Sequence, residues 1–230
     1  MKQHKIKVLA GAVMFCFGSM AYAGVSTTKH NLSSTGTGDF KTAGTTEICV
    51  FCHTPHMTEA KGTALPLWNH TLQSAATNYG VYASDTFDGA GTAADTVAST
   101  TVDGSTVSTL CLSCHDGSIA VSSLMNGPNG STITCDSTAA DTGTDCILDA
   151  NETTNLGNDL SNDHPVNFTY DGALETADGS LNDSTALTYG VLYGGKVQCA
   201  SCHDPHESVN PTFLRGPMTD STLCLDCHNK

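Results

Sequence analysis

One five-residue pattern, Cys-x-x-Cys-His, occurs four times in this chain, at residues 49–53, 111–115, 199–203 and 224–228. In each copy the two thiols and the imidazole occupy positions i, i+3 and i+4, which lie on one side of a helical turn. The thiols can then bond the two vinyl groups of one porphyrin while the imidazole binds its iron. This spacing is the attachment signature of a c-type haem.

The sequence therefore predicts four covalently bound haem c groups. The predicted attachment residues are Cys49, Cys52, Cys111, Cys114, Cys199, Cys202, Cys224 and Cys227. The predicted proximal iron ligands are His53, His115, His203 and His228. Structural zinc or a redox dithiol are the alternatives, but neither requires a histidine directly after the second cysteine in every copy.

The first 23 residues have the features of a signal peptide. Lys2, Lys5 and Lys7 give a basic start, residues 8–17 are apolar, and the small-x-small sequence at 21–23 is typical of a cleavage site. No later segment reaches the ~20 apolar residues of a membrane-spanning helix. We expect export across the inner membrane to the cell exterior or cell surface, with the periplasm as the alternative.

Two cysteines remain outside the haem motifs and the signal peptide, Cys135 and Cys146. Exported proteins fold where disulfides persist, so the sequence predicts a disulfide between them. A fifth haem with an unusual attachment motif is the alternative, but no histidine follows Cys146.

The composition predicts a fold with little ordinary core. Residues 84–109 and 129–163 are rich in Ser, Thr, Gly, Asn and Asp, and such tracts bury little apolar surface. We expect a mostly irregular, loop-rich chain with short α-helices at the haem motifs, little β-structure, and the porphyrins as its core.

Acidic residues dominate the charge. Removal of the signal peptide leaves six basic residues against 23 acidic ones, a net charge of −17. A surface of this sign disfavours nucleic acid and anionic lipid as partners.

The motifs repeat in the order ABAB. Motifs one and three share Cys-x-x-Cys-His-x-Pro-His, and motifs two and four share Leu-Cys-Leu-x-Cys-His. We expect a single tetrahaem domain over 24–230, with haem pair one at about 24–125, a polar insert with the disulfide at about 126–162, and haem pair two at about 163–230.

The sixth ligand of each iron decides between electron transfer and catalysis. The mature chain has five further histidines as candidate distal ligands, His30, His56, His70, His164 and His206. Bis-histidine ligation of all four irons would leave one of them spare. Irons saturated in this way have no position for a substrate, so the count favours an electron-transfer protein over an enzyme.

His30 lies only seven residues into the mature chain, on a polar arm. This position supports the hypothesis that His30 ligates a haem of the next subunit. Such a head-to-tail contact builds a filament when its rotation does not close.

Five segments carry a resemblance to known proteins: KHNLS at 29–33, CVFCHTPH at 49–56, PLWNH at 66–70, HPV at 164–166 and CASCHDPH at 199–206. With them the chain resembles multihaem c-type cytochromes of the doubled CxxCH type, and in particular OmcE-type tetrahaem cytochromes. The resemblance implies subunits that polymerise into extracellular nanowires through continuous stacks of bis-histidine haems, with one axial histidine donated across the subunit boundary.

Three functions follow as expectations. The first is a homopolymeric, conductive extracellular filament that passes electrons to other cytochromes, a metal oxide or a partner cell. The second is a monomeric periplasmic carrier that serves a reductase. The third is a multihaem reductase, which the surplus of histidines disfavours.

Overall fold

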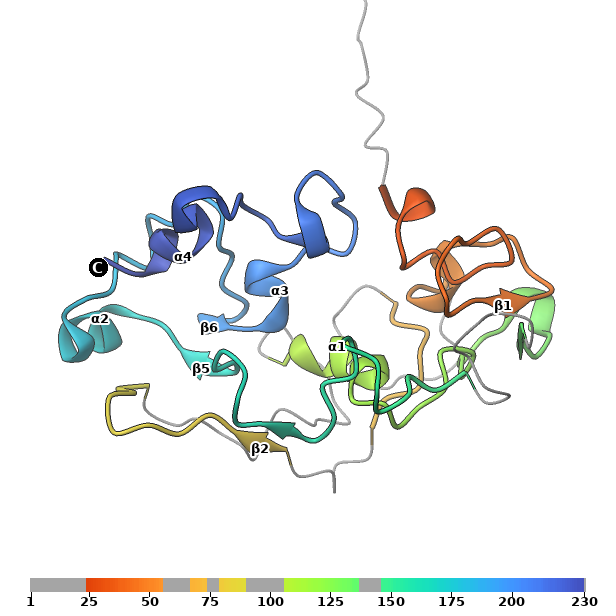
Figure 1. Cartoon of the computed structure of the whole chain (residues 1–230), viewed down its shortest axis with the longest axis horizontal. Helices are drawn as coiled ribbons and strands as arrows, with labels where there is room; N and C mark the ends of the chain where they lie inside the picture. Colours follow the sequence, from red (N-terminus) through yellow and green to blue (C-terminus); the bar gives the residue numbers. More distant parts are fainter. Residues whose placement is uncertain (1–23, 56–66, 74–78, 90–105, 137–145, 230) are drawn as a thin grey trace, which may run out of the picture.

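The computed structural model describes residues 24–55, 67–73, 79–89, 106–136 and 146–229. The expected signal peptide and His56 therefore lie outside the described residues. The described chain is elongated, and most of it is loop (Figure 1).

Helices are short, and three of the four α-helices carry haem motifs. They are α1 (Ser108–His115), α2 (Gly172–Asp178), α3 (Cys199–Cys202) and α4 (Thr222–Cys227). Motif one begins in a single 3-10 turn, Cys49–Phe51. The other 3-10 turns are Gly24–Thr27, Pro128–Gly130, Pro211–Phe213 and Thr219–Ser221. The expectation of short helices at the motifs is thus confirmed.

Within the described ranges the strands form three antiparallel or parallel pairs, each strand two residues long. β1 (Thr42–Ala43) pairs antiparallel with β3 (Thr134–Cys135). β2 (Gly80–Val81) pairs parallel with β4 (Asp159–Leu160). β5 (Phe168–Thr169) pairs antiparallel with β6 (Lys196–Val197). Each pair ties together segments that lie far apart in the sequence, so these strands fasten loops and do not form a layer.

The helix without a haem motif, α2, has strong local signals at both ends. The Asp171 carboxylate accepts hydrogen bonds from the N–H groups of Ala173 (3.0 Å) and Leu174 (3.1 Å) at its first turn. Gly179 ends the helix in the left-handed conformation, at φ 68°. Leu174 then anchors the helix in the apolar cluster around Phe168.

The apolar interior is divided. Within the described ranges the buried hydrophobic side chains form four clusters, each of three or four residues. A chain of this length with a conventional core would join such clusters into one. The divided core agrees with the expected fold class, which is confirmed as mostly irregular and loop-rich.

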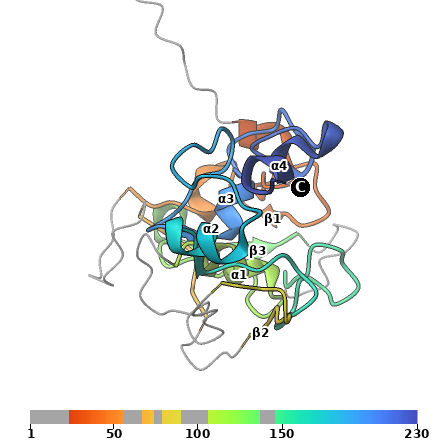
Figure 2. The same ribbon diagram turned by 90° about the vertical axis from the view of Figure 1, so that its left-hand side faces the viewer.

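The haem motifs follow one another along the molecule. In Figure 1, α4, α3 and α1 succeed each other from the left toward the centre of the long axis. Seen along that axis, α3 lies near the middle of the molecule, with α4 above it and α1 below it (Figure 2). None of the helices in the described part of the chain is long and apolar enough to cross a membrane.

Candidate haem-binding site

The thiols of consecutive motifs lie close together in chain order. Cys52 of motif one interacts electrostatically with Cys111 and Cys114 of motif two. Cys111 interacts electrostatically with Cys199 of motif three. In the same way, Cys202 of motif three interacts with Cys224 of motif four. The eight motif cysteines thus form an uninterrupted series, and none of them forms a disulfide, so all eight are available for thioether bonds to haem.

Burial at the junction of motifs one and two disfavours the thiolate form of Cys52 and Cys114. Burial, followed by the nearby Cys49 thiol, raises the pKa of Cys52 to about 11. Burial, followed by Cys52, raises the pKa of Cys114 to about 12. A medium that disfavours the thiolate is also one that suits the apolar face of a porphyrin.

Three of the four motif histidines face a second histidine from elsewhere in the chain. The ring centroids of His53 and His206 are 6.0 Å apart with 12° between their planes. Those of His30 and His115 are 6.0 Å apart. The third pair, His164 with His228, has its centroids 6.3 Å apart.

This spacing fits one iron between two imidazoles. A metal–nitrogen bond of ~2 Å on each side, with the iron in line with both rings, separates ring centroids by ~6 Å. Two rings stacked face to face lie closer, as His30 and Phe213 do at 4.4 Å, whereas edge-to-face rings span up to ~7 Å. The three pairs therefore fit axial ligation of a haem iron.

Hydrogen bonds fix which ring nitrogen of these histidines faces the partner ring. Nδ1 of His115 donates to the Thr154 carbonyl (2.8 Å), and Nδ1 of His164 donates to the Pro165 carbonyl (2.9 Å). Nδ1 of His203 donates to a carbonyl in the same way, that of Thr212 (2.8 Å). Ligands of a metal are oriented by such bonds, which leave Nε2 for the iron.

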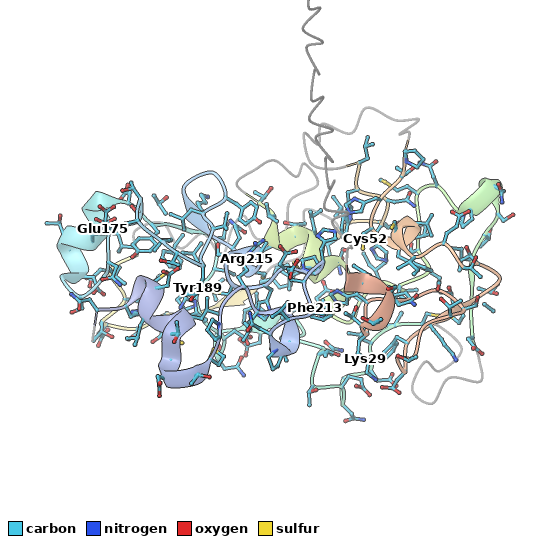
Figure 3. All side chains as sticks on the ribbon, turned by 90° about the horizontal axis from the view of Figure 1, so that it is seen from above. Lys29, Cys52, Glu175, Tyr189, Phe213 and Arg215 are labelled. Carbon is cyan, nitrogen blue, oxygen red and sulfur yellow. A yellow bond between two sulfur atoms is a disulfide. The ribbon has the colours of Figure 1, made fainter. Side chains whose placement is uncertain are left out.

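His206 has a carboxylate as its orienting partner. Its Nδ1 lies 3.2 Å from Oδ1 of Asp204, and Oδ2 of Asp204 lies 3.1 Å from the Arg215 guanidinium. Arg215 also donates to the Ala200 carbonyl (2.8 Å) and to the Tyr193 hydroxyl (3.0 Å). Arg215 lies near the middle of the molecule (Figure 3), where it holds the Asp204 carboxylate against His206.

The N-terminal arm folds back on its own chain. His30 stacks on Phe213 with 11° between the rings, and the Gly24 N–H donates to the His206 carbonyl (2.8 Å). Burial, followed by the nearby His115, lowers the pKa of His30 to about 4. In the single chain His30 faces His115, and ligation of a haem in the next subunit by His30 stays a prediction.

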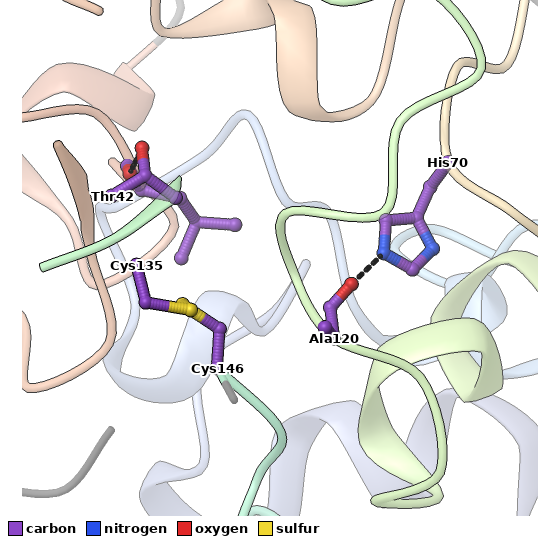
Figure 4. Close-up of a disulfide and its surroundings, with 6 residues drawn as sticks. Thr42, His70, Ala120, Cys135 and Cys146 are labelled. Carbon is purple, nitrogen blue, oxygen red and sulfur yellow. Dashed lines mark hydrogen bonds between the residues drawn. A yellow bond between two sulfur atoms is a disulfide. The ribbon is translucent and has the colours of Figure 1, made fainter. Parts of the chain in front are cut away.

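His70 has backbone partners instead of a histidine. Its Nδ1 lies 2.9 Å from the Thr71 carbonyl oxygen, and its Nε2 lies 2.9 Å from that of Ala120 (Figure 4). The ring is 1% exposed, and burial lowers its pKa. His70 joins two segments of the first half of the chain beside Cys114, whose sulfur lies 3.6 Å from Nε2.

Further features beside the histidines fit a haem group. The indole nitrogen of Trp68 is buried and lacks a hydrogen-bond partner among the described residues. Its ring lies edge-on to His53, with centroids 6.5 Å apart, where a haem propionate would supply an acceptor. A hollow of about 320 Å³ adjoins Cys49 and His53 at motif one.

The two cysteines outside the motifs, Cys135 and Cys146, form a disulfide (Figure 4). Cys146 is fully buried and packs with Val121 and Leu148. The disulfide ties Cys146 to β3, the strand that contains Cys135 and pairs with β1. Across the described ranges, no group of three or more His, Cys, Asp or Glu side chains is arranged to hold a metal ion directly.

Residues 193–230 match a protein-family model described as the doubled CXXCH motif. The match includes motifs three and four. None of the curated proteins matches the chain. The family match supports a multihaem c-type cytochrome with covalently bound haem c that carries electrons.

Sequence analysis overlooked the residues that orient the histidines. Asp204 lies between the two candidate ligands His203 and His206 and was recognisable as an acidic side chain next to them. Phe213 and Trp68 have no comparable local signal, because only the path of the chain brings them to His30 and His53.

Proposed function

We propose that this protein is a tetrahaem electron-transfer cytochrome and a subunit of an extracellular conductive filament. Each haem, when bound, supplies an iron that alternates between the ferric and ferrous states. The observation that carries the proposal is the uninterrupted series of motif thiols, from Cys52 through the Cys111–Cys199 contact to Cys224.

The chain's own residues would supply both imidazoles for three of the four irons. The ring pairs support His206, His30 and His164 as distal ligands for the irons of motifs one, two and four. The sequence predicts His56 as a further distal ligand from its repeat position. Closed shells favour electron transfer over substrate chemistry.

The two ends of the series are accessible to solvent. Cys49 in motif one and Cys224 in motif four are exposed, whereas the Cys111 and Cys199 side chains lie at the junction inside the chain. Electrons could thus enter at one end and leave at the other, which is what a repeating conductor requires. The large negative charge of the mature chain favours cationic or metal-bearing acceptors.

Three measurements on the secreted native protein test this proposal. Mass spectrometry is expected to find four haem adducts per chain, and a Cys111→Ser/Cys114→Ser variant should carry one fewer. The ferric spectrum is expected to be low-spin, and a high-spin spectrum would contradict bis-histidine ligation.

Electron microscopy then separates the assembly states. Filaments are expected for the conductor, and dispersed single subunits would support the periplasmic carrier instead. Reduction of a small oxidised substrate at a vacant iron would favour a reductase.

A further inference from the structure

A buried polar cluster joins motif two to motif three. The Ser108 hydroxyl donates to Oε1 of Gln198 (2.5 Å), and the Ser108 N–H donates to the same oxygen (3.1 Å). In return the Cys199 N–H donates to the Ser108 hydroxyl (3.0 Å). Ser108 begins α1 and Gln198 precedes α3, so these bonds tie one motif helix to the other.

Asn167 completes the cluster from a third segment. Nε2 of Gln198 donates to Oδ1 of Asn167 (3.0 Å), and the Asn167 N–H donates to the Val197 carbonyl (2.6 Å). Ser108, Gln198 and Asn167 are each 1% exposed. A buried amide whose oxygen and nitrogen both form hydrogen bonds fixes the orientation of the groups around it.

The cluster lies beside the contact between two haem-attachment thiols. Cys111 of α1 interacts with Cys199 of α3, and the two helices are in contact. The separation of α1 and α3 therefore decides how closely the haem groups of motifs two and three approach. Electron tunnelling slows steeply as the distance between redox centres grows.

Apolar packing between α1 and α3 does not fix the separation of the two helices. Val107, Leu110 and Ala200 form a small cluster there. Such contacts resist separation, but they are non-directional and allow the helices to slide or rotate. The directional bonds from Ser108 and Gln198 remove that freedom.

We propose that Ser108, Gln198 and Asn167 act as a positioning cluster that sets the spacing between the haem sites of motifs two and three, and so governs electron passage between the two halves of the chain. This inference rests on the proposed electron-transfer function. The three side chains act through the backbone and the cysteines, and none of them is assigned a contact with iron.

The test compares Gln198→Met, which keeps the side-chain volume and removes the hydrogen bonds, with wild type. Thr42→Val is the matched control, because Thr42 is fully buried and its hydroxyl donates to the Leu32 carbonyl (2.9 Å), away from the junction. Haem adducts are counted and the ferric spectrum is recorded first. Coupling between haems is then measured by Soret circular dichroism, and internal electron equilibration by rapid photoreduction.

Gln198→Met is expected to keep four haems and a low-spin spectrum, to change the Soret couplet, and to slow equilibration severalfold. Thr42→Val should match wild type in all four measurements. An unchanged couplet and rate in fully loaded Gln198→Met would overturn the inference, as would an equal change in Thr42→Val.

If Gln198→Met loses haem, Ser108→Ala replaces it as the test variant. The smaller variant should load fully and show the same direction of change. Loss of haem from both variants, with Thr42→Val loaded, would overturn the inference, since the cluster would then act on folding alone. Missing haem or a high-spin spectrum in wild type would instead count against the proposed function.

Discussion

The imidazole rings of His53 and His206 lie nearly parallel, with 6.0 Å between their centroids, although one belongs to motif one and the other follows motif three. The pair links the two halves of the ABAB repeat. His206 is in turn held by Asp204, whose second oxygen contacts Arg215. The negative charge on Asp204 therefore influences the electron density that His206 donates to a bound iron.

Asp204→Asn is expected to raise one reduction potential on the order of tens of millivolts, because loss of the carboxylate weakens the histidine as a ligand and leaves Arg215 uncompensated. Both effects favour the ferrous state. Spectroelectrochemical titration of the four haems measures the shift. Asp39→Asn is the matched control, since Asp39 forms an exposed ion pair with Lys29 at 3.1 Å. Equal shifts in the two variants would contradict the assignment.

His30→Ala is expected to convert one haem per chain to the high-spin form, because it removes the ring that faces His115. Ferric electron paramagnetic resonance and carbon monoxide binding to the reduced protein measure the vacancy. The comparison uses dispersed single subunits. A high-spin haem already present in dispersed wild type would contradict the intrachain pairing and favour a histidine donated by a neighbouring subunit.

The short helices at the haem motifs were predictable from the sequence. The pairing of histidines from distant parts of the chain was not. Helices at motifs two, three and four follow from spacing within five residues, and the loop-rich fold follows from composition. The approach of His30 to His115 depends instead on the arm that turns back over Phe213. Loop closures of this kind carry no periodic signal, since the left-handed conformation of Thr212 and Phe213 is one that non-glycine residues rarely adopt.

His70→Gln is expected to keep a fully low-spin spectrum and to lower the free energy of unfolding by ~1–3 kcal/mol. The reason is that the buried ring lies between the Thr71 and Ala120 carbonyls and donates its one N–H to one of them. Denaturant unfolding followed by far-ultraviolet circular dichroism measures the loss. A new high-spin haem in this variant would show that His70 is a ligand.

The hydroxyl of Tyr79 makes the stability sensitive to alkaline pH. Tyr79 is 3% exposed and donates to Asp116 at 2.6 Å. Burial, followed by the bond to Asp116, raises the pKa of Tyr79 above its usual value. The phenol thus stays protonated in the folded chain, so its stabilisation is complete below pH ~10 and is lost as the pH rises beyond the pKa of an unfolded tyrosine.

Tyr79→Phe should therefore weaken the loss of stability at high pH, by up to ~1.4 kcal/mol per pH unit for the single group. At neutral pH the variant should be less stable, because Asp116 loses a partner. Denaturant unfolding at several pH values measures both effects. Tyr82→Phe is the control that removes a phenol elsewhere, and an identical pH dependence in the two variants would be incompatible with this role.

The disulfide between Cys135 and Cys146 contributes to folding separately from the haems. It closes a loop with a sequence separation of 11, and its buried end packs with Val121 and Leu148. Replacing both cysteines with serine is expected to lower the free energy of unfolding by roughly 2–4 kcal/mol, with the haem count unchanged. A thiol reductant should reproduce the loss in wild type and have no effect on the double variant, because thioether bonds to haem resist reduction. Equal stability of reduced and oxidised wild type would mean that the apolar packing alone holds the insert against β1 and β3.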